Sequence, residues 1–123
     1  RNANLLCWHR ELYFIDHGAA LYFHHVWKSM PGKAESAFRE IGHHILLPWA
    51  ERLEEADEIA RKRLNPNIFT RILEEVPEAW LLPEAKELSA AEKRAVYLEF
   101  FTRRLANSSK FVEEATRARA ELI

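Results

Sequence analysis

Two short apolar runs, separated by three polar residues, occupy the beginning of the chain. Residues 4–8 and 12–15 are rich in side chains that favour strands, and residues 9–11 form the polar link between them. Two such runs joined so closely predict a β-hairpin. Asp16-His17-Gly18 follows the second run and is expected to end its strand.

The remainder of the chain has the spacing of helices. Its apolar residues recur mostly at steps of three and four, which places them on one face of a helix. Pro31 and Gly32 predict a loop over 29–32, and the region 80–88 is expected to be a connector with one turn after Pro83. The predicted helices span residues 19–27, 33–46, 48–64, 66–75, 89–107 and 109–122.

Local start signals support several of these helices. Asn65 precedes Pro66 as a cap before a first-turn proline, and Ser89 with Glu92 matches a capping box. Ser109 is expected to cap the last helix. The faces expected to be buried are Ala34, Ala37, Phe38, Ile41 and Ile45; Trp49, Leu53, Ala56 and Ala60; Ala91, Ala95, Leu98, Phe101 and Leu105; and Phe111, Ala115, Ala118 and Leu122.

Length and charge narrow the class of protein. The 123 residues suffice for one domain, and a net charge of -1 offers no basic excess for nucleic acid. A single cysteine, Cys7, excludes an internal disulfide, and no apolar run reaches the length of a membrane span. We expect a cytoplasmic protein of mainly α class, with an N-terminal hairpin (1–18) and about six helices (19–123).

Asn2 and Asp16 are the candidate metal ligands. Asp16 follows Asn2 by 14 positions, with the predicted hairpin between them. The two ends of a hairpin lie side by side, and Mg²⁺ prefers oxygen ligands such as a carboxylate and an amide. In protein kinases an Asn after the catalytic loop and an Asp after the next hairpin hold Mg²⁺ against nucleotide phosphates. The same residues could instead serve only as turn and cap residues.

A longer stretch of sequence resembles a known family. Arg-Asn-Ala-Asn-Leu-Leu at residues 1–6 and Leu-Tyr-Phe-Ile-Asp-His-Gly-Ala-Ala-Leu-Tyr-Phe-His-His at 12–25 resemble the corresponding segment of bacterial HipA-like kinases, which are related to protein kinases. The close similarity covers residues 1–27, and the family's C-terminal lobe is helical. The resemblance implies ATP- and Mg-dependent phosphoryl transfer, with Asn2 and Asp16 as the metal-binding residues.

The resemblance also implies a fragment. The catalytic Asp is expected about five positions before Asn2, and therefore upstream of Arg1. The nucleotide-binding lobe is likewise absent, so we expect a C-terminal-lobe fragment that is inactive alone and whose natural partner is the missing lobe. His17 stands where the family has Phe. We expect apolar surface around Trp8 and Phe14 to be exposed and to favour a homodimer.

Two other functions remain open. The chain could be a non-enzymatic helical interaction module, or a metalloprotein using the pairs His24-His25 and His43-His44. Adjacent helical residues point about 100 degrees apart, so each pair offers one good ligand at most. His44 is expected to be a hydrogen-bonded core residue.

The remaining conspicuous side chains are given structural roles. Cys7 is expected to be buried in its strand. The basic runs 61–63 and 103–104 are expected to be solvated surface. Aromatic side chains are expected in the core: Trp8, Trp27, Trp49, Trp80, Phe100 and Phe101.

Overall fold

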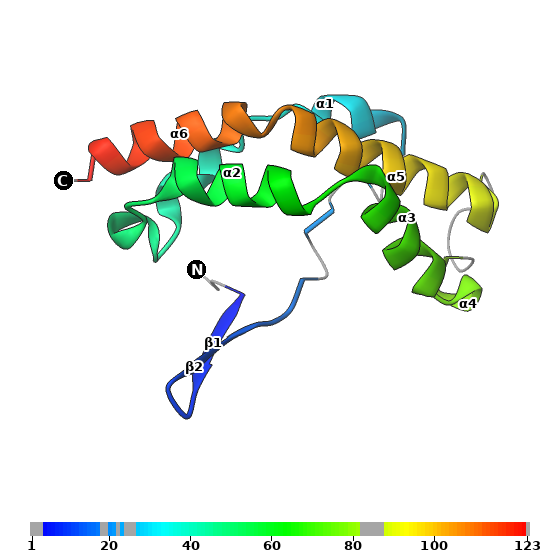
Figure 1. Cartoon of the computed structure of the whole chain (residues 1–123), viewed down its shortest axis with the longest axis horizontal. Coiled ribbons are helices and arrows are strands. Elements are labelled where there is room, and N and C mark those ends of the chain that lie inside the picture. The colour runs from blue at the N-terminus through cyan, green and yellow to red at the C-terminus, as the bar shows by residue number, and fades with distance from the viewer. Residues whose placement is uncertain (1–3, 18–19, 22, 24–26, 82–87, 123) are drawn as a thin grey trace.

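The computed structural model describes residues 4–17, 20–21, 23, 27–81 and 88–122, and shows a helical body from which a β-hairpin projects (Figure 1). The predicted fold class, mainly α with an N-terminal hairpin, is confirmed. The elements are β1 (Leu5–Trp8), β2 (Glu11–Phe14), η2 (Trp27–Ser29), α1 (Met30–Ala34), η3 (Arg39–His43), η4 (Leu47–Trp49), α2 (Leu53–Arg63), α3 (Pro66–Glu75), α4 (Glu78–Leu81), α5 (Ala90–Ala106) and α6 (Ser108–Ala120).

The hairpin is antiparallel, and Leu5 pairs with Phe14 at its open end. The link is shorter than predicted because Glu11 belongs to β2, which leaves His9 and Arg10 as a two-residue turn. Both turn residues have positive φ, 50° and 68°. Such a turn matches the right-handed twist of the flanking strands, at a steric cost for residues other than glycine.

The region 29–46 differs from the prediction. A short helix, α1, replaces the loop expected at 29–32, with Pro31 in its first turn. The helix predicted over 33–46 is wrong: α1 ends at Ala34, and only the 3₁₀ helix η3 follows. Phe38, with φ 55°, interrupts the helical path, and its N–H donates to Ser36 Oγ at 3.2 Å. Serine side chains compete in this way with helical hydrogen bonds.

The next two helices differ in how well their starts were predicted. The helix predicted over 48–64 begins later, at Leu53, because the 3₁₀ helix η4 occupies 47–49. α3 begins at Pro66 as predicted, with Asn65 Oδ1 accepting from the N–H of Ile68 at 3.1 Å. The predicted connector at 80–88 overlaps α4, and its residues 82–87 lie outside those described. Most of the helix predicted at 19–27 also lies outside them.

The capping box at the start of α5 is confirmed. The N–H of Ser89 donates to Glu92 Oε2 at 2.7 Å, and the N–H of Glu92 donates to Ser89 Oγ at 3.2 Å. Of the predicted buried face, Ala91 and Ala95 are exposed, whereas the expected burial of Phe100 is confirmed.

The last helix, α6, begins one residue earlier than predicted. Asn107 occupies the cap position instead of Ser109, and its side chain makes no capping hydrogen bond. Ala115 and Ala118 are buried as predicted, whereas Leu122 is exposed.

An aromatic cluster on α5 forms the first core. Phe23, only 1% exposed, lies with its ring centroid 4.7 Å from that of Phe100 and 5.7 Å from that of Tyr97. Trp27 closes the group at 5.5 Å from Tyr97. The buried Lys93 donates to the carbonyl of Leu81, which ties α4 to α5.

The second core lies at the other end of the body. Leu47 packs with Ala115 and Ala118 of α6, and Ile41 and Leu53 cover them. α5 and α6 follow one another along the long axis, with α3 beside α5 and α2 beside α6 (Figure 1). None of the helices in the described part of the chain is long and apolar enough to cross a bilayer.

Candidate functional site

The open end of the hairpin holds Asp16, the described member of the predicted metal pair. The N–H of Ile15 donates to the carbonyl of Asn4 at 2.9 Å. The side-chain amide of Asn4 donates to the carbonyl of Asp16, so the chain is held together across the hairpin at this point. Asn2 lies outside the described residues. The distance from Asp16 to its predicted partner is therefore untested.

Asp16 and Asn4 share an unusual backbone conformation. Their φ angles are 54° and 52°, in the left-handed region where residues other than glycine are strained. Asp and Asn tolerate this region best among such residues, and strained positions cluster at functional sites. Asp16 is exposed, so its carboxylate can be reached from solvent.

The chemistry of Asp16 suits magnesium. Mg²⁺ is usually held by one or two carboxylates together with water and phosphate oxygens, and a single exposed Asp meets the protein's part of that requirement. Within the described ranges, no three His, Cys, Asp or Glu side chains gather as a metal site. Further ligands would have to come from outside the described residues or from water.

The histidines give the zinc alternative little geometric support. His43 is exposed and lies 3.5 Å from a carboxylate oxygen of Glu40. Nδ1 of His44 accepts a hydrogen bond from the N–H of Leu46 at 3.2 Å, so that nitrogen is already used. His24 and His25 lie outside the described residues. His44 is hydrogen-bonded as expected, but it is only partly buried.

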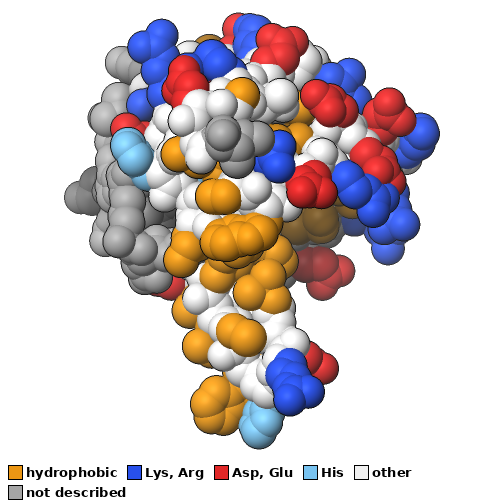
Figure 2. Space-filling view, turned by 90° about the vertical axis from the view of Figure 1, so that its left-hand side faces the viewer, with side chains coloured by type: hydrophobic (Ala, Val, Ile, Leu, Met, Phe, Trp, Pro, Cys, Tyr) orange, Lys and Arg blue, Asp and Glu red, His pale blue; other side chains and the backbone are white. Residues whose placement is uncertain are grey.

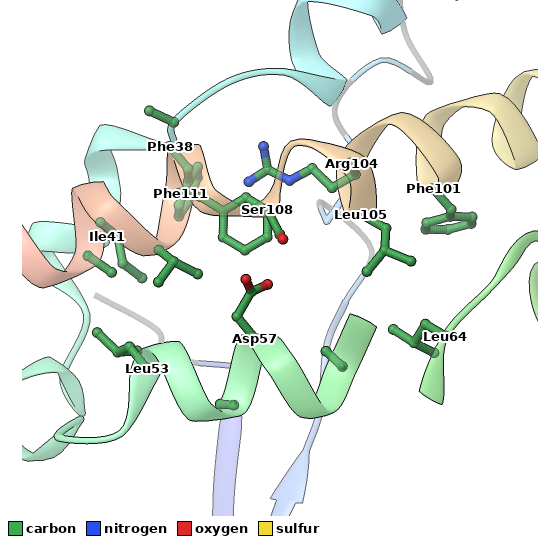
Figure 3. Close-up of a pocket in the computed structure, with 15 residues that line it drawn as sticks. Phe38, Ile41, Leu53, Asp57, Leu64, Phe101, Arg104, Leu105, Ser108 and Phe111 are labelled. Carbon is green, nitrogen blue, oxygen red and sulfur yellow. The ribbon is translucent and has the colours of Figure 1, made fainter. Parts of the chain in front are cut away.

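A groove that the sequence did not reveal lies between α2 and the junction of α5 with α6. Its volume is about 440 Å³, and its walls are mostly apolar side chains of these helices and of residues 37–41. Figure 3 shows Asp57 of α2 pointing across it toward Ser108 and Phe111 of α6. No residue of α2 is fully buried, because the helix faces this space instead of packing tightly.

Two polar groups that line the groove, Asp57 and Ser108, are both bound by Arg61 of α2, which lies outside the lining. Arg61 Nε lies 2.9 Å from Asp57 Oδ2 and donates to Ser108 Oγ, also at 2.9 Å. Ser108 is only 1% exposed, so the hydrogen bond from Arg61 satisfies a buried oxygen. The carboxylate of Asp57 therefore has its cation beside it.

Arg104 is the groove's other charged residue and was wrongly predicted to be solvated surface. Its Nη1 donates to the carbonyls of Ala34 and Ser36, and its guanidinium lies 4.2 Å from the ring centre of Phe111. Burial lowers the pKa of this guanidinium. Among the described residues, no carboxylate lies within ion-pair distance of it.

The exposure of side chains on the hairpin, η4 and α4 corrects two further predictions. Cys7 is exposed, and of the aromatic residues expected in the core Trp8, Trp49 and Trp80 are exposed, the last by 75%. Apolar side chains cover the projecting end of the molecule (Figure 2). The expected exposure around Trp8 and Phe14 is confirmed, with Phe14 73% exposed.

No known family model, curated protein or solved structure matches this chain. Interpretation therefore depends on the residues themselves.

Proposed function

We propose that this chain is part of an ATP- and Mg-dependent phosphotransferase of the HipA-like kind, with Asp16 and Asn2 as its metal-binding residues. The observation that carries the proposal is the fixed backbone of Asp16 at the open end of the hairpin. The Asn4 side chain binds the Asp16 carbonyl, and Asn4 stands two residues after Asn2. This contact limits how far the segments before and after the hairpin can separate.

The proposed role of each group follows from its chemistry. When bound, Mg²⁺ neutralises charge that develops on the transferring phosphoryl group. The Asp16 carboxylate would hold the ion, and the Asn4 amide would orient the backbone that carries Asp16. Asp16, with its left-handed φ of 54°, lies two residues beyond the end of β2.

The exposed hairpin supports the idea that the chain works with another part of a protein. A two-stranded hairpin alone is marginally stable in water, and this one presents apolar side chains on both faces. A nucleotide-binding kinase lobe is the proposed partner. An Asp about five positions before Asn2 in the parent protein, preceded by a nucleotide-binding lobe, would support this; its absence would refute it.

Metal binding by the chain itself gives a direct test. Mn²⁺ substitutes for Mg²⁺ and broadens the NMR signals of nearby amides. We expect broadening centred on Ile15, Asp16 and His17, lost in Asp16→Asn. The matched control is Glu11→Gln, which removes the same charge from the opposite end of the hairpin. Broadening that is unchanged in Asp16→Asn, or equally reduced in Glu11→Gln, would contradict the proposal.

The second candidate function is a non-enzymatic interaction module, which the exposed apolar hairpin also favours. It predicts a homodimer through Trp8 and Phe14 without any need for metal. Because the kinase hypothesis also expects a homodimer through this surface, light scattering of the purified chain and of Phe14→Ser distinguishes the two only together with the Mn²⁺ experiment. A dimer that Phe14→Ser dissociates, together with absent Mn²⁺ broadening, would favour this second function.

A further inference from the structure

We propose that the groove between α2 and the α5–α6 junction binds a small amphiphilic carboxylate, with its apolar tail between the helices and its carboxylate on Arg104. This site is separate from the proposed metal site and does not depend on it. The groove's volume of about 440 Å³ falls in the range of pockets that hold small organic ligands.

The apolar walls define the tail of the ligand. Leu53 lies on α2, Leu64 directly follows that helix, and Phe101, Leu105 and Phe111 lie on the facing helices (Figure 3). These side chains line one continuous space. Filling it with an alkyl or aromatic group would remove both sets of apolar surfaces from water, which is favourable.

Charge defines the head group. Arg104 is the lining cation that lacks a counter-ion among the described residues, whereas Asp57 already has Arg61 at 2.9 Å. The hydrogen bonds of Arg104 to the carbonyls of Ala34 and Ser36 use only Nη1, so Nε and Nη2 have no acceptor within the described part of the chain. A guanidinium with two donors left matches the two oxygens of a carboxylate.

The same arrangement argues against a cationic ligand. A cation would need an acidic group that is not already paired, and Asp57 is held by Arg61 while Ser108 Oγ accepts from it. An amphiphilic amine would in addition meet Arg104 with like charge. The groove is thus selective for the sign of the head group as well as for an apolar tail.

The test compares three ten-carbon probes, decanoate, decanol and decylammonium, below their micelle concentrations. Binding to the 123-residue chain is followed by chemical-shift changes of amides in α2 and α6. We expect decanoate to bind about tenfold or more tightly than decanol, since charge-assisted hydrogen bonds are the stronger kind, and decylammonium to bind weakest. Equal affinities, or no binding of decanoate, would overturn the proposal.

Variants locate the site. Arg104→Gln should remove the preference for decanoate over decanol, whereas Arg103→Gln, at the neighbouring position with its partner Glu99 at 2.7 Å, should keep it. Ala60→Phe places a ring in the groove and should abolish binding of every probe. If Arg104→Gln fails to fold, the three-probe comparison on the unaltered chain and Ala60→Phe still decide. Full decanoate binding by Ala60→Phe would refute the site, as would stronger binding of an acidic amphipathic peptide than of decanoate.

Discussion

The turn of the hairpin offers a direct physical test of the geometry that places Asp16. His9 and Arg10 both have positive φ, at 50° and 68°. Asn-Gly is the preferred pair for such a turn because Asn tolerates the left-handed region and glycine has no Cβ to clash. The double change His9→Asn with Arg10→Gly should therefore stabilise the closed hairpin without altering its strands.

The magnitude follows from the two φ angles. A left-handed non-glycine residue costs roughly 1–2 kcal/mol, and glycine returns roughly 0.5–1 kcal/mol of this through its greater freedom in the open state. Arg10→Gly therefore gains roughly 0.7 kcal/mol net, and Asn, which tolerates the left-handed region, relieves about half of the cost at position 9, again roughly 0.7 kcal/mol. Together the gain is about 1.4 kcal/mol, which corresponds to about a tenfold change in the opening equilibrium. The hairpin projects from the body, so this gain acts on local opening and not on global unfolding.

Amide hydrogen exchange measures that opening. The N–H of Ile15 donates to the Asn4 carbonyl at 2.9 Å, beyond the last strand pair, and exchanges only when the hairpin's open end separates. We expect its exchange in the double variant to slow about tenfold. Glu11→Gly, in an extended strand position, should speed it instead. Unchanged or faster exchange of Ile15 in the double variant would refute the proposed turn geometry.

The remaining predictions concern the helical body. Ser89→Ala should lower the free energy of unfolding by about 1 kcal/mol in urea titrations, because it removes a helix cap, whereas Ser109→Ala should change it little. The hydrogen bonds from the Ser89 hydroxyl and then its N–H lower the pKa of Glu92, so the capping box contributes above the ordinary carboxyl pKa and is lost as pH falls through the lowered value. The gap in melting temperature between Ser89→Ala and the unaltered chain should thus narrow in acid without closing, because the hydrogen bond from the Glu92 N–H to Ser89 Oγ does not need the carboxylate; a constant gap would contradict this. Arg94→Met should destabilise by about 2 kcal/mol, since its guanidinium donates to two carbonyls at the end of α3, at 3.1 and 2.9 Å. An equal effect of Arg71→Met, on the exposed side of α3, would show that those bonds are not the cause.

Elements with local start signals were predictable. Asn65 and Pro66 mark the start of α3, and Ser89 with Glu92 marks that of α5, because a cap is made by residues adjacent in sequence. The region 33–46 had apolar spacing but no such signal. There the Ser36 hydroxyl binds the N–H of Phe38, and the chain leaves the helical path despite its periodicity.

Burial was harder to predict than helicity. The face of α5 that was predicted to be buried included Ala91 and Ala95. Alanine is so small that its spacing alone does not show which side of the helix faces the core. Phe100, which precedes Phe101 in sequence, shows which side of α5 faces the core, because its ring centroid lies 4.7 Å from that of Phe23. That contact spans most of the chain and depends on tertiary packing.

Of the two candidate sites, the one built from neighbouring residues was predictable and the one built from distant segments was not. Asp16 could be placed at the end of a hairpin because a hairpin is local. The groove could not be foreseen, since it brings Leu53 and Asp57 of α2 against Phe111 of α6, more than fifty positions later. Arg104 could not be told from a surface Arg in the sequence, because its partners, the carbonyls of Ala34 and Ser36, lie far away along the chain.

The most direct measurement is phosphoryl transfer from labelled ATP by the full-length parent protein carrying Asp16→Ala. The proposal predicts that transfer is abolished while the circular dichroism spectrum is unchanged, and that Glu11→Gln retains activity. Full transfer by the Asp16→Ala protein would remove Asp16 from the mechanism and with it the proposed magnesium site.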